Sequence, residues 1–190
     1  MLLSNKHKFA FVHIPKTGGT SIKAALLPYA NAGQLHFEGE KVTDLNGYRP
    51  HVKIKRGDHP GKLKFAVVRN PWSWYVSYWK FAKVRNLRPA DKQDFDTFIR
   101  SLGTPQCKFS KLQSSWVTQG KTLLVDRLLK FESLAYDFKE LCQELYLPEL
   151  ELKHYKNAGQ YDYREFYTDE TREIIEKHCQ KDCTMFHYDF

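Results

Sequence analysis

The chain contains 190 residues, of which 42% are hydrophobic, so it holds enough apolar material for a core and is not disordered as a whole. Its 30 Lys+Arg against 22 Asp+Glu give a formal charge of +8 and a pI of about 9.2. The length suits a single domain over residues 1–190, and the longest early apolar stretch, Phe9–Ile14, falls far short of the roughly 20 residues that span a bilayer, so no membrane span is expected.

The positive charge is compatible with nucleic acid, an acidic membrane surface, a nucleotide, or a sulfated or phosphorylated acceptor as a partner. The lysines are scattered along the chain and do not form one basic block, so the charge alone selects none of these partners. Most of these lysines are expected to form a solvated surface.

The cysteines are widely spaced and form no Cys-x-x-Cys pair: Cys107, Cys142, Cys179 and Cys183. This spacing, and the absence of a secretory signal in Met1–Lys8, favour a reducing cytoplasm. Cys179 and Cys183 stand four residues apart near His178 and His187, which would allow two ligands on one helix face. Structural zinc sites have tighter paired spacings, so we predict no metal.

The first elements expected in chain order are a strand, a loop and a helix. Phe9–Ile14 is too short for a helix and is predicted to be a buried strand, bounded by Pro15. Ser21–Leu27 has the composition of a helix, which Pro28 ends. Asn31–Gly61 shows little periodicity and is expected to form loops with at most short elements.

A second strand and two helices are expected next, and the first of these helices is capped. Phe65–Arg69 is an apolar strand, and Asn70 can cap a helix that has Pro71 at its first position. Apolar residues recur at helical spacing over Phe95–Leu102, directly after Asp94.

The C-terminal part continues the alternation of strands and helices. Leu123–Val125 and Leu128–Phe131 resemble strands, and Leu134–Leu145 carries an apolar helical stripe that ends before Pro148. Thr168 can cap a last helix with an acidic first turn. Such alternation predicts an α/β fold with a mostly parallel central sheet flanked by helices on both faces.

The strongest local motif is His13-Ile-Pro-Lys-Thr-Gly-Gly-Thr-Ser21, which connects a strand to a helix. Gly18 and Gly19 let the backbone turn its N–H groups toward an anion, and the helix adds its positive N-terminus. The motif differs from the ATP-binding pattern G-x-x-x-x-G-K-[ST], because Gly19 stands where that pattern has lysine and Lys16 comes three positions earlier. Side-chain donors come from four residues: Lys16, Thr17, Thr20 and Ser21.

A second motif, Val67–Tyr78, contains Arg69 at the end of a strand and Ser77 about two turns into the next helix. Arginine offers a planar fork of donors that suits a phosphate, and serine adds a hydroxyl. The sequence therefore predicts two anion sites.

These two motifs in this order resemble those of the sulfotransferases that use 3′-phosphoadenosine 5′-phosphosulfate (PAPS). The similarity is greatest to the branch of carbohydrate sulfotransferases that includes heparan sulfate 2-O-sulfotransferase and small bacterial members. It extends more weakly to Phe131–Leu134, Tyr163–Thr168 and Lys181–Tyr188, and so covers nearly the whole chain. It implies a P-loop NTPase-like three-layer fold, PAPS as the donor, and 3′,5′-adenosine bisphosphate (PAP) as the product.

The resemblance also implies roles for individual residues. The arginine and serine, here Arg69 and Ser77, would bind the 3′-phosphate. Lys156 and Asn157, in a late loop, resemble residues that close over the nucleotide. The first loop would bind the 5′-phosphosulfate through six residues: Lys16, Thr17, Gly18, Gly19, Thr20 and Ser21.

Lys16 is expected to stabilise charge on the departing phosphate oxygen during in-line transfer, without a divalent metal. The acceptor hydroxyl needs a base, which relatives take from the segment between the motifs. His51 is the first candidate and His59 the second. A histidine suits the role because, with a pKa of about 6.5, it accepts a proton near neutral pH. His13 is expected to be a packed core residue. Less favoured bases are also present: His36, Glu38 and Glu40.

An aromatic cluster overlaps the second motif and comprises Trp72, Trp74, Tyr75, Tyr78 and Trp79. Helical spacing puts several of these rings on one face, which favours a core role over stacking on a sugar.

The main prediction is a PAPS-dependent sulfotransferase acting on a hydroxyl acceptor such as a saccharide or a small molecule. A P-loop kinase or another phosphotransferase is the alternative, and it requires magnesium-dependent ATP binding. A nucleic-acid binder is the weakest alternative, because it leaves the two motifs unexplained. No feature of the sequence identifies the acceptor or the oligomeric state.

Overall fold

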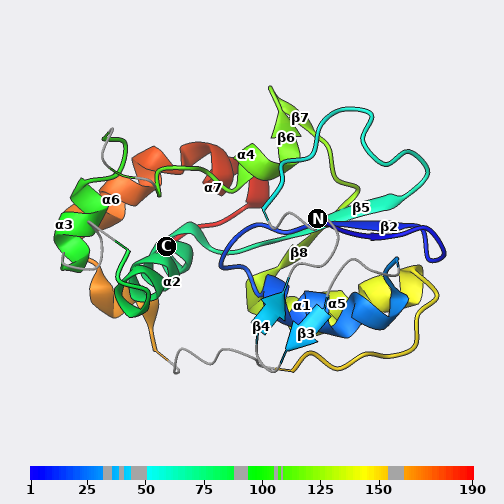
Figure 1. Cartoon of the computed structure of the whole chain (residues 1–190). Coiled ribbons are helices and arrows are strands. Elements are labelled where there is room, and N and C mark those ends of the chain that lie inside the picture. The colour runs from blue at the N-terminus through cyan, green and yellow to red at the C-terminus, as the bar shows by residue number, and fades with distance from the viewer. Residues whose placement is uncertain are drawn as a thin grey trace. The chain divides into compact units, whose positions relative to one another are not determined.

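The computed structural model describes most of the chain, namely residues 1–31, 36–38, 41–43, 51–87, 94–104, 107, 109–153 and 161–190 (Figure 1). Its contacts divide the chain into two compact units. The sheet unit comprises Met1–Val68 and Ser115–Asn157, and the helical unit comprises Arg69–Ser114 and Ala158–Phe190. The expectation of a single domain over residues 1–190 stays a prediction.

The sheet unit is built on four strands in the order β1-β2-β5-β8. β2, β5 and β8 are parallel, and β1 pairs with β2 in the antiparallel direction. This arrangement confirms a mixed α/β protein with a mostly parallel central sheet. The bounds are β1 Leu2–Ser4, β2 Phe9–Val12, β5 Leu63–Val68 and β8 Arg127–Lys130.

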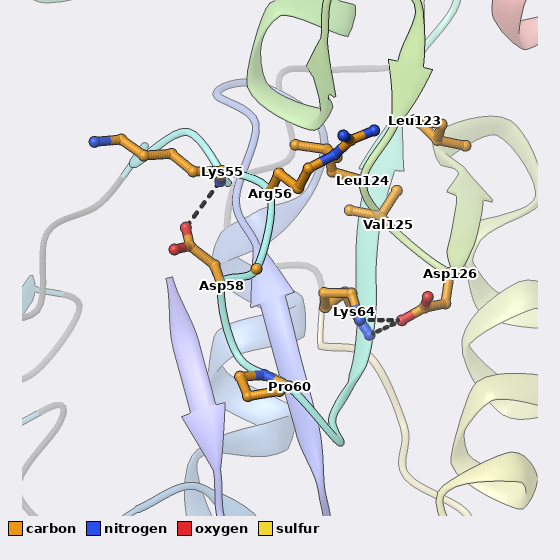
Figure 2. A pocket seen from close by; sticks show the side chains of 10 residues that line it. Lys55, Arg56, Asp58, Pro60, Lys64, Leu123, Leu124, Val125 and Asp126 are labelled. Atoms are coloured by element: carbon orange, nitrogen blue, oxygen red, sulfur yellow. Dashed lines mark hydrogen bonds and ion pairs between the residues drawn. The ribbon is translucent and has the colours of Figure 1, made fainter.

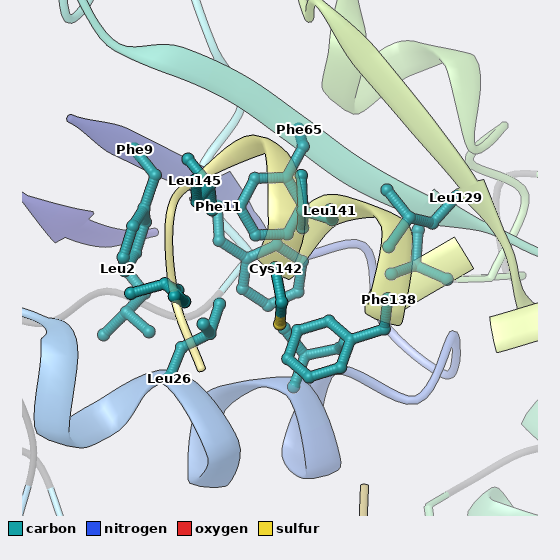
Figure 3. Packing of buried hydrophobic residues seen from close by; sticks show 13 residues of the cluster. Leu2, Phe9, Phe11, Leu26, Phe65, Leu129, Phe138, Leu141, Cys142 and Leu145 are labelled. Atoms are coloured by element: carbon teal, nitrogen blue, oxygen red, sulfur yellow. The ribbon is translucent and has the colours of Figure 1, made fainter. Parts of the chain in front are cut away.

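Alternation along the strands creates the hydrophobic core on one face of the sheet. The rings of Phe11 and Phe65 come from neighbouring strands and stack with centroids 5.0 Å apart. Helices α1 (Gly19–Leu26) and α5 (Leu134–Glu144) supply the partners for these rings (Figure 3). The cluster consists of Leu2, Phe9, Phe11, Ile22, Leu26, Phe65, Val67, Leu129, Phe138, Leu141, Cys142, Leu145 and Leu147.

Shorter elements complete the sheet unit. The expected strand over Leu123–Val125 is wrong at its C-terminal end. β7 stops at Leu123 because its partner strand begins only at Thr118, and the Leu124 N–H donates over 2.8 Å to the carbonyl of Val117, the last residue of helix α4. The short elements expected within Asn31–Gly61 include the antiparallel pair β3 and β4. The bounds are η1 Leu27–Tyr29, β3 His36–Glu38, β4 Lys41–Thr43, α4 Ser114–Val117, β6 Thr118–Gln119, β7 Thr122–Leu123 and η2 Phe131–Ser133.

Capping side chains start two helices of the helical unit where the sequence predicts them. The Asn70 side-chain oxygen accepts the N–H groups of Trp72 and Ser73, over 3.0 and 3.3 Å. Thr168 and Thr171 exchange reciprocal side-chain and backbone hydrogen bonds, which form a capping box. The bounds are α2 Pro71–Val84, α3 Phe95–Arg100, η3 Tyr163–Phe166, α6 Asp169–His178 and α7 Gln180–Phe186.

The aromatic residues of α2 form the core of the helical unit. The Trp74 ring contacts Tyr75 and Tyr78, with centroids 5.2 and 4.8 Å apart. Trp72 is also buried, whereas Trp79 is half-buried. A packing role is therefore confirmed for the four buried rings.

The described residues also carry information on membrane spans and metal sites. No helix among them is long and apolar enough to cross a membrane. Within the same part of the chain, no group of three or more His, Cys, Asp or Glu side chains is placed to hold a metal ion. The four cysteines are all unpaired thiols.

Candidate active site

The loop between β2 and α1 has the backbone of an anion site. Lys16 and Gly18 adopt left-handed φ angles of 66° and 80°. Successive turns of this kind aim backbone N–H groups toward a common point, where an anion can bind. The helix that follows contains no acidic residue in its first turn, so its positive N-terminus is not neutralised there.

The two glycines of the loop are needed for different reasons. A Cβ on Gly18 would lie 2.8 Å from the Leu134 Cδ2 atom, and its left-handed φ disfavours any side chain. A Cβ on Gly19 would lie 2.0 Å from Cδ2 of His13 and 2.1 Å from Nε2 of the same ring. The loop therefore packs so closely that neither position accommodates a methyl group without movement of its neighbours.

The side chains of the loop differ in how they can contribute to binding. Thr17 is fully buried, and its hydroxyl donates to the Ile14 carbonyl over 2.8 Å. This bond stabilises the loop, so Thr17 would meet a ligand through its backbone N–H. Lys16, Thr20 and Ser21 are half-buried, which suits side-chain contact with a bound anion.

The second predicted anion site lies in the helical unit. Arg69 directly follows β5 and is 9% exposed, and its Nε–H donates to Ser73 Oγ over 2.9 Å. Ser77 lies further along α2 and is buried. The sequence interpretation missed Ser73, although a hydroxyl four residues after the arginine was visible in the motif.

A histidine pair adjoins the glycine loop within the sheet unit. His51 Nδ1 lies 3.2 Å from the His13 carbonyl oxygen, and the two rings have centroids 4.4 Å apart. A carbonyl can only accept, so His51 Nδ1 carries the proton of the neutral ring and Nε2 is the basic nitrogen. The Trp116 Nε1–H donates to the His51 carbonyl over 3.3 Å and fixes this segment from the other side.

The packing of these rings controls their protonation. Desolvation lowers the pKa of His51 below its ordinary 6.5, and Lys23 adds a repulsive charge, while the bond to the His13 carbonyl acts in the opposite direction. Burial, followed by the charge of His51, lowers the pKa of His13 much further. His51 is therefore neutral at physiological pH, as a general base must be.

His13 is a buried core residue, as the sequence predicts. Its Nδ1 atom has no hydrogen-bond partner in the part of the chain that the structure describes. The ring also packs over Gly19 and therefore links the loop to His51.

His59 lies at the other end of the sheet. It precedes β5 and adopts a left-handed φ of 53°, in a turn closed by the Lys62 N–H and the His59 carbonyl. β2 and β5 are parallel, and the glycine loop leaves the carboxyl end of β2. His51 and the glycine loop are thus brought together, whereas His59 and the loop lie at opposite ends of the parallel strands.

A surface hollow of about 300 Å³ lies at the amino-terminal ends of β5 and β8, on the same side as His59 (Figure 2). Its carboxylates are already engaged, since Asp126 accepts from the Lys64 backbone N–H over 2.7 Å and Asp58 accepts from the Lys55 N–H over 2.8 Å. None of the residues that line this hollow is a predicted site residue. It gives no support to a donor site.

Some predicted residues lie outside the described part of the chain. This holds for Lys156, Asn157 and Glu40. His36 and Glu38 belong to β3, of which only the backbone is described. Their proposed roles stay predictions.

The fold and the loop define an α/β protein with a glycine turn suited to bind an anion at the start of α1. A family model described as "Sulfotransferase family" matches residues 1–189. The chain therefore belongs to the sulfotransferase family, whose members are transferases of sulfuryl groups. No curated protein and no solved structure matches the chain.

Proposed function

We propose that this protein transfers a sulfuryl group from PAPS to an acceptor hydroxyl. The observation that carries the proposal is the loop from β2 to α1, where two obligatory glycines and left-handed turns prepare an anion site. We also propose that this loop belongs to a P-loop-like arrangement with helices on both faces of the sheet. The acceptor is proposed to be a carbohydrate or a small molecule.

The donor itself explains why two anion sites are needed. PAPS carries phosphate groups at the 3′ and 5′ positions of its ribose, and ATP lacks the 3′-phosphate. Arg69 and Ser77 would select for that phosphate, with Lys156 and Asn157 as further nucleotide contacts. The loop would bind the 5′-phosphosulfate through Lys16, Thr17, Gly18, Gly19, Thr20 and Ser21.

The proposed reaction is a direct in-line transfer. His51 Nε2 accepts the proton of the acceptor hydroxyl as its oxygen forms a bond to sulfur. The bond between sulfur and the 5′-phosphate oxygen breaks, and Lys16 stabilises the negative charge that develops on that oxygen. PAP and the sulfated acceptor are the products, and the residues in these roles do not require a divalent metal. His59, the second candidate from the sequence, precedes β5 at the opposite end of the strands from the loop, so we do not propose it as the base.

The four unpaired thiols suit a reducing compartment, and we propose the cytoplasm. Nucleic acid is not a proposed partner, because the two motifs are explained by a mononucleotide donor.

Isothermal titration calorimetry with PAP and ATP tests the proposal. We expect PAP to bind in the presence of EDTA and to bind more tightly than ATP with magnesium. Tight binding of ATP only with magnesium would contradict the proposal and favour a phosphotransferase.

Two variants separate the proposed roles in the same assay. Arg69→Ala is expected to weaken PAP binding at least tenfold, because the 3′-phosphate loses a charged hydrogen-bond donor. Lys16→Ala is expected to lower turnover more than PAP affinity, because its role is to stabilise charge in the transition state. Lys121→Ala, on an exposed turn of the sheet unit, is a matched control and should change neither quantity.

A further inference from the structure

We propose that Gln113 is the positioning residue for Arg69, and that Asp182 holds Gln113 in place. This inference rests on the proposed function, in which Arg69 binds the 3′-phosphate of the donor. All three residues belong to the helical unit and are buried.

The side-chain amide of Gln113 binds both backbone groups of Arg69. Gln113 Oε1 accepts the Arg69 N–H over 2.9 Å, and Gln113 Nε2 donates to the Arg69 carbonyl over 2.7 Å. Arg69 stands immediately after the last residue of β5, where the hydrogen bonds of the strand end. The glutamine thus supplies the pair of bonds that a neighbouring strand would supply, and fixes the arginine backbone beyond the end of the sheet.

Asp182 holds the backbone that carries this glutamine. One carboxylate oxygen accepts the Gln113 N–H over 2.7 Å and the other accepts the Ser114 N–H over 3.0 Å. Asp182 is fully buried, and a buried carboxylate is tolerated only when hydrogen bonds compensate its desolvation. Two segments far apart in the sequence, residues 113–114 and α7, are thereby joined, and the first of them carries the glutamine that binds Arg69.

The guanidinium end of Arg69 has a separate constraint. Its Nε–H donates to Ser73 Oγ, and Ser73 is fixed in the first turn of α2 by the Asn70 cap. An arginine binds phosphate through a planar fork of donors, so its selectivity depends on the direction of that fork. Gln113 at the backbone and Ser73 at Nε together set this direction.

A purely structural role would predict a different result from a positioning role. A structural glutamine affects stability and affects all ligands alike. A residue that positions Arg69 affects only ligands with a 3′-phosphate. Comparing PAP with adenosine 5′-monophosphate (AMP), which lacks that phosphate, separates the two roles.

The test measures the dissociation constants of PAP and AMP by calorimetry for the full-length protein and its variants. Gln113→Met keeps the volume of the side chain and removes both of its hydrogen bonds to Arg69. We expect PAP binding to weaken about tenfold or more while AMP binding changes less than twofold. Gln143→Ala, at an exposed position of α5, is the matched control and should leave both constants unchanged.

A double variant tests whether Gln113 acts through Arg69. Adding Gln113→Met to Arg69→Ala should weaken PAP binding no further, because the positioned side chain is already absent. If Gln113→Met does not fold, Gln113→Glu replaces it, since this variant keeps the length and the acceptor but places an oxygen against the Arg69 carbonyl. It too should lose the preference for PAP.

The outcomes distinguish the inference from the proposed function. A wild-type protein without a preference for PAP over AMP overturns the proposed function, and the inference with it. A wild-type preference that both Gln113 variants retain overturns the inference alone.

Discussion

Replacing Gly19 with alanine drives a methyl group into the imidazole of His13. The new Cβ would lie 2.0 Å from His13 Cδ2, whereas carbon atoms in contact normally stand about 3.5–4.0 Å apart. The ring has little room to withdraw, because it is buried between Phe11 and His51, with centroids 5.8 and 4.4 Å away. The substitution must therefore displace either the ring or the start of α1.

The size of the effect follows from this overlap. Overpacking a dense interior costs about 1–3 kcal/mol, and an overlap of about 1.5 Å belongs in the upper part of that range. The better helix propensity of alanine returns up to about 1 kcal/mol. We therefore expect Gly19→Ala to lower the free energy of unfolding by about 2 kcal/mol. PAP binding should weaken as well, because the loop moves.

Urea unfolding of a double-mutant cycle measures this directly. In a His13→Ala background the obstructing ring is absent, so Gly19→Ala should cost nothing or stabilise the protein slightly. Gly18→Ala is the matched control, since its cost arises from a left-handed φ and from Leu134 and should be equal in both backgrounds. An equal cost of Gly19→Ala in the two backgrounds would refute the reasoning.

Three further predictions concern histidines and thiols. The pKa of His13 in the folded protein lies below 6.5, so the unfolded chain binds a proton that the folded chain does not. The free energy of unfolding, measured by urea unfolding at several pH values, should therefore fall as the pH drops below about 6.5. It should fall less steeply in His13→Phe. His51→Ala should abolish turnover in a sulfuryl-transfer assay and leave PAP binding nearly intact. Wild-type kcat should decline only below pH 6.5, because the pKa of His51 is lowered. If turnover survives in His51→Ala, another residue is the base. Iodoacetamide should label the half-buried Cys107 before Cys179, because burial raises the pKa of the Cys179 thiol; mass spectrometry measures the order. Faster labelling of Cys179 would contradict its burial.

Local sequence signals predicted the elements that depend on neighbours in the chain. Asn70 with Pro71, and Thr168 with an acidic turn, start helices where expected, because capping satisfies backbone N–H groups within three residues. The apolar runs Phe9–Ile14 and Phe65–Arg69 contain β2 and the end of β5, and the alternation of such strands with helices predicted a mostly parallel sheet. β1 and α7 escaped prediction, because such short segments carry too little periodicity.

The candidate site shows the same division. Residue type and spacing alone identify the glycine loop and Arg69 as candidate anion sites. The assignment of these residues to one donor stays a prediction. Gln113 had no signal, because its contact with Arg69 joins positions 44 residues apart.

The sequence by itself determined the α/β class, the two motifs and the family to which they point, since these depend on residue types at short spacing. Only the tertiary structure decided that His13 packs on Gly19, that His51 rather than His59 adjoins the loop, and that a buried glutamine holds Arg69. The physical reason is that packing and buried hydrogen bonds join residues from distant parts of the chain, and no local pattern encodes which ones meet.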